Sequence, residues 1–184
     1  MPRAVTAPAP AGLILAPGAS ADRDDPTLVA LDAGLPEIAV VRLTLATTSV
    51  KNAAGKINGA AEALAEELGV DTGQLAYGGR SFGGRACSMA VAEGLPATAL
   101  VLLSYPLHPP GTPEKLRVEH FPAISVPTLF ISGDKDPFGS PDEFDAHVGD
   151  IAGPVRQEWV AGNHSPKARI DGIVALVRSF FGLD

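Results

Sequence analysis

The sequence has little with which to hold metals, form disulfides or attract polyanions. Its 184 residues include one cysteine, Cys87, and contain neither a CxxC pair nor a Cys/His cluster with zinc-ligand spacing. Acidic residues outnumber basic ones by 21 to 14, giving a net charge of −7. Because nucleic acids and anionic membranes attract positive fields, we expect neither as a partner. A small-molecule substrate or a protein partner in the reducing cytoplasm fits this composition.

Long hydrophobic stretches are also missing. Apolar runs such as "ATALVLL" fall far short of the roughly 20 residues that span a bilayer. The N-terminus superficially resembles a cleavable signal, since Arg3 precedes an apolar patch and "ASA" follows it. However, the patch 12–16 is short and flanked by prolines. We expect it to be the first core strand, preceded by a flexible or extended segment over residues 1–11.

Short apolar runs recur between amphipathic segments, which is typical of a parallel sheet buried on both faces. The expected strands are 12–16, 38–43, 75–78, 99–105, 128–132 and 156–161. Helical spacing predicts a helix over 52–68, capped by Asn52 and stopped by Gly69, another beginning after Ser140, and a last one from Ile170. We therefore predict one α/β domain over residues 1–184, a three-layer sandwich whose parallel strands follow the order 2-1-3-4-5-6.

One connection departs from this alternation of strands and helices. Residues 106–127 contain six prolines. They leave room only for a short helix near 113–119, so we expect no cap domain over the sheet.

The stretch "LAYGGRSFGGRACSMA", residues 75–90, places a serine among glycines between an expected strand and helix. It lies near the phosphate-binding frame G-x-x-x-x-G-K-[ST], but Arg85 and Ala86 replace the lysine and the hydroxyl that this chemistry needs. It matches G-x-S-x-G in full, a turn that lifts Ser81 clear of the sheet. Side chains two positions either side would collide, which explains Gly79 and Gly83. Cys87, on the following helix, is expected to be a small buried residue.

A serine nucleophile needs a base, and the base needs an orienting carboxylate. Of the four histidines, His164 follows the last expected strand and is the best candidate. His108 is expected at a pocket rim, whereas His120 and His147 are expected to be solvated side chains. The acid should come from "SGDKDPFG", which offers Asp134 and Asp136.

These sequence motifs resemble those of an α/β-hydrolase of the dienelactone-hydrolase-like kind. More narrowly, the chain is similar to the branch that contains testis-expressed protein thirty and the hydrolase-like domain of subunit three of the NSL acetyltransferase complex. The resemblance rests on "LAPGASADRDDP", "GGRSFGGRA", "LSYPLHPPG", "FISGDKDPF" and "AGNHS", and it covers most of the chain from Gly12 to Ser165. It implies a six-stranded core, since the sequence leaves no room for the two strands that usually precede "GLILA".

The resemblance also implies site residues. It favours Asp136 over Asp134 as the partner of His164 and Ser81, and it implies an oxyanion hole from the backbone N–H groups of Phe82 and Ala19. The chain departs from many relatives by having Pro17-Gly18 where they have His-Gly, a change that the backbone donor can survive.

The function expected from these residues is cofactor-free hydrolysis of an ester or related acyl compound through an acyl-enzyme. The rival is a non-catalytic protein-interaction domain on the same scaffold, because some members of the resembled branch serve as parts of assemblies. Four residues are expected to contact a substrate with an apolar group: Tyr105, Leu107, His108 and Phe138. Arg80 and Arg85 flank the serine turn and are expected either to pair with loop carboxylates or to recognise an anion.

Overall fold

The sheet has the predicted topology. The structure, a computed structural model, describes residues 5–165 and 167–183; residues 1–4, 166 and 184 lie outside the described part, and with them Arg3. Within the described residues, six strands pair in the order β2-β1-β3-β4-β5-β6, and every pair is parallel. The strands are β1 (Gly12–Ala16), β2 (Ala39–Arg42), β3 (Leu75–Arg80), β4 (Ala99–Leu103), β5 (Thr128–Gly133) and β6 (Val155–Val160).

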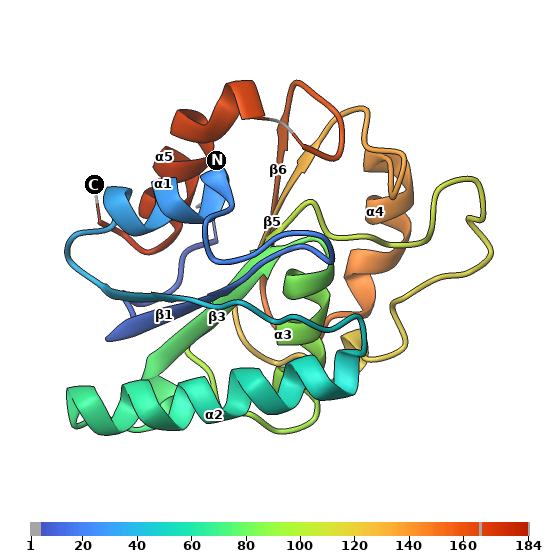
Figure 1. Cartoon of the computed structure of the whole chain (residues 1–184). Coiled ribbons are helices and arrows are strands. Elements are labelled where there is room, and N and C mark those ends of the chain that lie inside the picture. The colour runs from blue at the N-terminus through green and yellow to red at the C-terminus, as the bar shows by residue number, and fades with distance from the viewer. Residues whose placement is uncertain (1–4, 166, 184) are drawn as a thin grey trace.

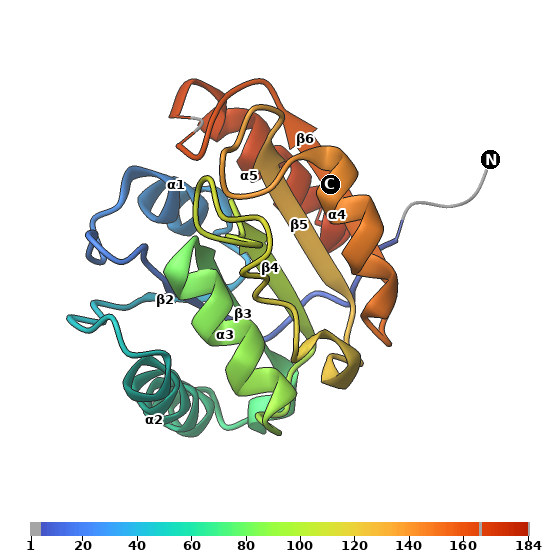
Figure 2. The same cartoon turned by 90° about the vertical axis from the view of Figure 1, so that its right-hand side faces the viewer.

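Helices cover both faces of this sheet (Figure 1, Figure 2). On one face, α1 (Pro26–Gly34) and α5 (Ile170–Phe180) pack against residues such as Leu13 and Val101. On the other face lie α2 (Val50–Leu68), α3 (Phe82–Ala92) and α4 (Pro141–His147). Alternate residues of each central strand enter the two cores, which is why these strands are apolar throughout. The three-layer α/β architecture is therefore confirmed.

The helices begin where side chains cap them. The carboxylate of Asp25 accepts hydrogen bonds from the N–H groups of Thr27 and Leu28 and so starts α1, a helix that the sequence analysis did not single out. Ser49, not Asn52, is the cap of α2, so this helix begins earlier than predicted. α4 begins after Ser140, as predicted, and a capping box between Ser140 and Glu143 closes its first turn.

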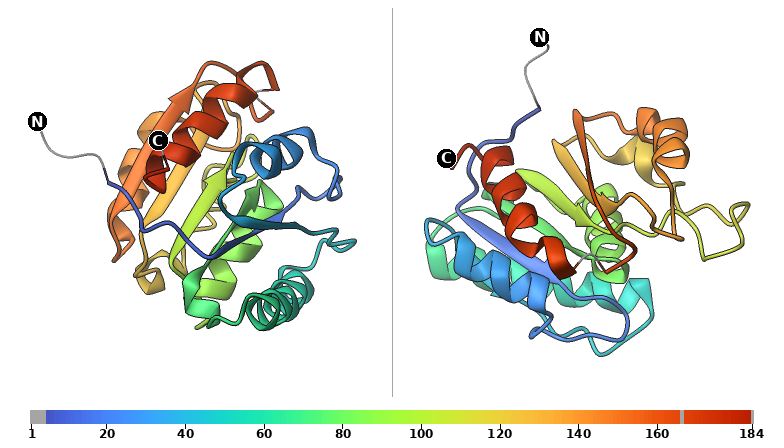
Figure 3. Two further views of the ribbon diagram at one scale, coloured as in Figure 1. Left: turned by 90° about the vertical axis from the view of Figure 1, so that its left-hand side faces the viewer. Right: turned by 90° about the horizontal axis from the view of Figure 1, so that it is seen from above.

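The terminal segment before β1 is extended and packed in its described part, 5–11. Ala7 is buried and its N–H donates to the carbonyl of Phe180 at 2.8 Å, beside α5 (Figure 3). Gly12–Ala16 forms β1, as predicted. No helix among the described residues is long and apolar enough to cross a membrane.

The proline-rich connection after β4 contains no helix at 113–119, contrary to the prediction. Its one helical turn among the described residues is the 3-10 helix η2 (Phe121–Ala123). The N–H of Arg117 donates to the carbonyl of Leu107, and the Tyr105 hydroxyl donates to the carbonyl of Arg117. The prolines have no backbone N–H with which to form a helix, so these bonds hold an irregular chain against the core. Figure 1 shows the segment looping out beside α4.

Candidate active site

Ser81 lies at a sharp turn between β3 and α3. Its backbone has φ 50° and ψ −117°, a conformation that costs free energy for a residue with a side chain. The turn is held because the Ser81 N–H donates to the carbonyl of Leu103 and its own carbonyl accepts from the N–H of Arg85. The hydroxyl is thereby presented at the carboxyl edge of the sheet, just before the first turn of α3.

The glycines around Ser81 are needed because side chains at their positions would collide, as expected. A Cβ on Gly79 would lie 2.1 Å from the carbonyl oxygen of Ala16, and one on Gly83 would lie 2.2 Å from the same atom. The obstacle is the backbone at the end of β1. A Cβ on Gly84 would lie 2.7 Å from the carbonyl oxygen of Gly79, so α3 packs directly on backbone.

We expect Gly83→Ala to lower the free energy of unfolding by about 1–3 kcal/mol, because backbone atoms of β1 and α3 must separate. Gly59→Ala is the matched control, since a Cβ at this position in α2 meets nothing within 4 Å. It should raise stability by about 0.5–1 kcal/mol. Denaturant unfolding of the two variants measures both effects, and equal stabilities would contradict the close-packing account.

Three side chains form a hydrogen-bonded chain at this edge. The Nε2 atom of His164 lies 2.8 Å from Ser81 Oγ, and its Nδ1 atom lies 2.8 Å from Asp136 Oδ2 and 2.9 Å from Oδ1. Asp136 is an acceptor only, so Nδ1 carries the proton that it receives. Nε2 is then the unprotonated nitrogen, which leaves it able to accept the serine proton.

Asp136 and Asp134 have separate contacts. The carboxylate of Asp136 is buried and also accepts from the N–H of Phe138 at 2.9 Å. Asp134 is exposed and accepts from the N–H of Gly162 at 2.9 Å, so it fixes the loop that carries His164 without touching the imidazole ring. The structure thus places Asp136 beside the histidine and Asp134 behind its loop.

The imidazole of His164 is held from several sides. The ring of Phe138 stacks on it with centroids 4.0 Å apart and 26° between the planes. The guanidinium of Arg80 donates to the carbonyl of His164 at 3.0 Å and also bonds the Ser165 hydroxyl. Its other terminal nitrogen lies 3.7 Å from a carboxylate oxygen of Asp25, so Arg80 has the loop ion pair that was one of its two predicted roles.

Two backbone N–H groups beside Ser81 have no acceptor among the described residues: those of Phe82 and Ala19. Phe82 opens α3, so its N–H is one of the donors that no helical carbonyl can satisfy. Ala19 follows Gly18, and a Cβ on Gly18 would lie 3.9 Å from the Cβ of Ser81. The loop after β1 therefore lies against the serine despite Pro17, and both donors are available to an oxyanion.

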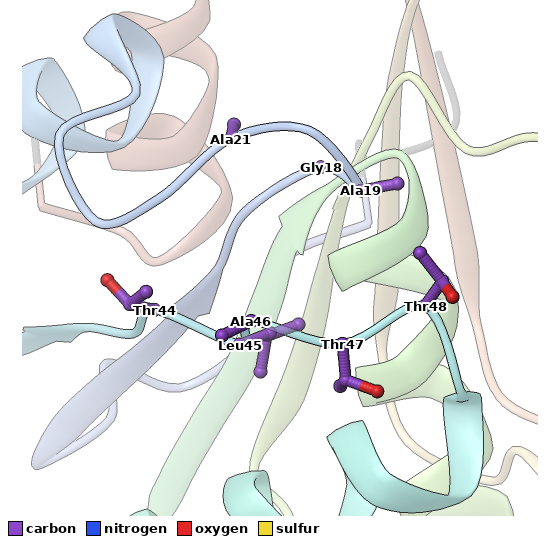
Figure 4. Close-up of a pocket in the computed structure, with 8 residues that line it drawn as sticks. All are labelled: Gly18, Ala19, Ala21, Thr44, Leu45, Ala46, Thr47 and Thr48. Atoms are coloured by element: carbon purple, nitrogen blue, oxygen red, sulfur yellow. The ribbon is translucent and has the colours of Figure 1, made fainter.

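Hollows surround the serine. A cavity of about 300 Å³ contains Ser81, Phe82 and Phe138, and one of about 290 Å³ contains Ser81, His164 and Arg80. A third, of about 370 Å³, lies between residues 18–21 and 44–48, which run one above the other beside α3 in Figure 4. Ala19 borders all three. The site is thus an open groove along the loop after β1.

Three of the four residues predicted to contact a substrate do not line these cavities. Tyr105 and Leu107 are fully buried in the core under the connection that follows β4. His108 is also buried, with Nε2 3.1 Å from Glu143 Oε1 and Nδ1 2.8 Å from the carbonyl of Pro109, so it ties this connection to α4 rather than forming a pocket rim. Of the four, Phe138 borders both cavities that contain Ser81.

The prediction that His120 is solvated is wrong. Its Nε2 lies 2.8 Å from the hydroxyl of Ser88, which itself donates to the carbonyl of Arg85, so the histidine is the donor. Burial, and then the nearby charge of Arg85, lower the pKa of His120 to about 4. His147, at the end of α4, is partly exposed and takes no part in the site.

Cys87 is fully buried and donates to the carbonyl of Gly78, as expected of a structural residue. Burial raises the pKa of its thiol to about 12, so it carries no thiolate at neutral pH. No group of His, Cys, Asp and Glu among the described residues could hold a metal ion.

The sequence analysis missed three residues of the larger Ser81 cavity: Thr48, Pro106 and Arg117. Each is in an irregular connection, where neither apolar periodicity nor a motif indicates direction. The run of basic and acidic residues around Arg117 carries no signal that one cation turns inward.

Comparison with known proteins agrees with the fold that positions this site. A family model described as an alpha/beta hydrolase domain matches residues 9–172. The structure of a dienelactone hydrolase from Anabaena variabilis superposes with a TM-score of 0.77 and 19% identity, covering 100% of this chain and 88% of that one. A thermophilic esterase from Thermogutta terrifontis superposes with a TM-score of 0.74 and 18% identity, covering 98% of this chain and 91% of that one. An alpha-beta serine hydrolase homologue from Coxiella burnetii superposes with a TM-score of 0.73 and 15% identity, covering 96% of this chain and 88% of that one. At these identities the likeness is one of fold.

Proposed function

The chain belongs to the alpha/beta hydrolase domain family, and from that premise we propose that it is a cofactor-independent serine hydrolase of an ester or related acyl compound. One observation carries the proposal: His164 Nε2 lies 2.8 Å from the hydroxyl of Ser81, which stands on a strained turn, while Asp136 holds the opposite ring nitrogen. Within the family we assign the chain to the branch of testis-expressed protein thirty and NSL subunit three, on the words "GGRSFGGRA" and "LSYPLHPPG".

The first half of the reaction forms an acyl-enzyme. Ser81 Oγ attacks the carbonyl carbon of the substrate while His164 Nε2 takes the hydroxyl proton. The ring becomes an imidazolium, and the carboxylate of Asp136 stabilises it through the Nδ1 proton. When the tetrahedral intermediate collapses, Nε2 gives its proton to the departing alkoxide, and the alcohol leaves.

The second half reverses these roles. Water loses a proton to His164 Nε2 and attacks the acyl carbonyl carbon, and the proton then passes to Ser81 Oγ as the carboxylic acid leaves. The sum is ester plus water to acid plus alcohol, so no oxidant, reductant or metal is required.

The N–H groups of Phe82 and Ala19 support the same reaction. In both halves the carbonyl oxygen becomes negative, and these two donors flank the serine without an acceptor of their own among the described residues. The N-terminal end of α3 adds a positive dipole at this point. Donors of this kind lower the barrier by about 3–4 kcal/mol each in other hydrolases.

A fluorophosphonate probe tests the proposal without a guess about the substrate. We expect the folded protein to take one label, on Ser81, with no added metal or nucleotide, because the probe reacts only with an activated serine. Peptide mapping identifies the site, and heat-unfolded protein is the control. Folded wild-type protein that takes no label would favour the rival assignment, a non-catalytic interaction domain on this scaffold.

A further inference from the structure

Two arginines border the larger Ser81 cavity with no acid to pair them. Arg85 lies one turn into α3, and Arg117 lies in the connection after β4. No carboxylate of the described residues lies within ion-pair distance of either guanidinium. The Nε atom of Arg85 is buried and has no hydrogen-bond partner among the described residues. A buried N–H donor without an acceptor costs free energy.

The charge of Glu119 acts on the neighbouring His120 and Tyr105, but no carboxylate of the described residues contacts the two guanidiniums. Burial, and then the charge of Arg85, lower the pKa of Arg117, which indicates that the two cations repel each other. His120 packs next to them as a neutral donor to Ser88. Arg80 differs from these two arginines, because its guanidinium lies 3.7 Å from a carboxylate oxygen of Asp25. An anion between Arg85 and Arg117 would supply the acceptor and the charge that both lack.

The position of His164 decides which part of a substrate meets these arginines. The leaving alcohol must receive its proton from Nε2, so it lies in the cavity that His164 borders. The acyl part then lies on the other side of Ser81, in the cavity that Arg85 and Arg117 border. Arg85 is four residues beyond Ser81, roughly 6 Å along the helix axis, which suits a short acyl chain.

We propose that the substrate is a half-ester of a short dicarboxylic acid, and that Arg85 and Arg117 bind its free carboxylate while Ser81 attacks the ester carbonyl. This assignment rests on the proposed hydrolase function. It adds a specificity for charge that the apolar residue Phe138 alone does not provide.

Monomethyl glutarate and the methyl ester of glutaramic acid form a matched pair of probes. The first carries a terminal carboxylate where the second carries a neutral amide, and they are otherwise the same. Release of methanol measures the hydrolysis of either ester. We expect wild-type kcat/KM to be at least about tenfold higher for the carboxylate ester. Arg85→Gln and Arg117→Gln should each lower that value by roughly 10- to 100-fold, mainly through KM, because each removes a charged hydrogen-bond donor. Both should change the neutral ester by less than about threefold.

Lys115→Gln is the matched control. It removes one positive charge from the same connection as Arg117, but its side chain is exposed and borders none of the three cavities around Ser81. The control should leave both esters unchanged. Fluorophosphonate labelling of each variant shows that the serine and the fold are intact.

Binding of free glutarate, measured by calorimetry, separates the two proposals. Wild-type binding that is lost in Arg117→Gln supports the anion site even if no ester is hydrolysed, in which case the hydrolase proposal alone fails. Equal hydrolysis of both esters, absence of glutarate binding, or tighter binding of inorganic phosphate than of glutarate would each overturn the half-ester assignment.

Discussion

Ser81→Ala should lower the rate of ester hydrolysis by about three orders of magnitude or more. The variant removes the enzyme atom that bonds the substrate carbon in the proposed reaction, while the donors of Phe82 and Ala19 stay in place. A residual rate above that of water is therefore expected, because oriented backbone donors still stabilise an oxyanion when water attacks. Release of p-nitrophenol from p-nitrophenyl acetate, without added metal or nucleotide, is the measurement.

A second serine provides the control for this experiment. Ser20 borders the cavity that contains His164, and it is exposed on the loop after β1. Ser20→Ala should retain the wild-type rate to within about threefold, since its hydroxyl is not hydrogen-bonded to His164. Weak hydrolysis by surface side chains is common, so the ratio between the two variants decides the matter. Equal rates for wild type and Ser81→Ala across a panel of esters would exclude Ser81 as the nucleophile.

Asp136→Asn should lower kcat by about 10³- to 10⁴-fold. The substitution keeps the size of the side chain but can turn an amide N–H₂ group toward Nδ1. The imidazole then carries its proton on Nε2, where it can no longer accept the proton of Ser81. Asp136 is buried and holds both His164 and the N–H of Phe138, so the amide has no alternative partner in solvent.

Asp134→Asn is the isosteric comparison two residues away. Its side chain can keep an oxygen toward the N–H of Gly162, so the loop of His164 should stay in place and kcat should fall less than about tenfold. Steady-state kinetics of both variants, with unfolding curves to check stability, compare them directly. Greater damage from Asp134→Asn than from Asp136→Asn would reverse the assignment of the acid.

Much of this architecture can be read from the sequence because it depends on short-range signals. Apolar runs predicted the six strands, and Gly79-Arg80-Ser81-Phe82-Gly83 marked the turn, since only glycine fits where α3 meets the backbone of β1. The capping box at Ser140 was equally local. By contrast, Asn52 and Ser49 are both acceptable caps by residue type, and only the structure shows that the Ser49 hydroxyl accepts the N–H of Asn52.

The errors fall in the proline-rich connection. Tyr105, Leu107 and His108 follow a strand that ends at the site, which suggested pocket residues, yet all three turn into the core. Their direction depends on long-range bonds, such as the one between His108 and Glu143, that no local pattern encodes. The same connection turns Arg117 inward, and sequence spacing gives no sign of it.

The bonds that fix the His164 loop have a kinetic consequence. Arg80, on β3, donates to the carbonyl of His164, and Asp134, just after β5, accepts from the N–H of Gly162. The proposed base is therefore anchored to the same sheet that carries the proposed nucleophile. A centre assembled in this way needs no closing motion before chemistry begins. Its turnover should then be limited by bond making or by product escape from an open groove rather than by the opening and closing of a gate.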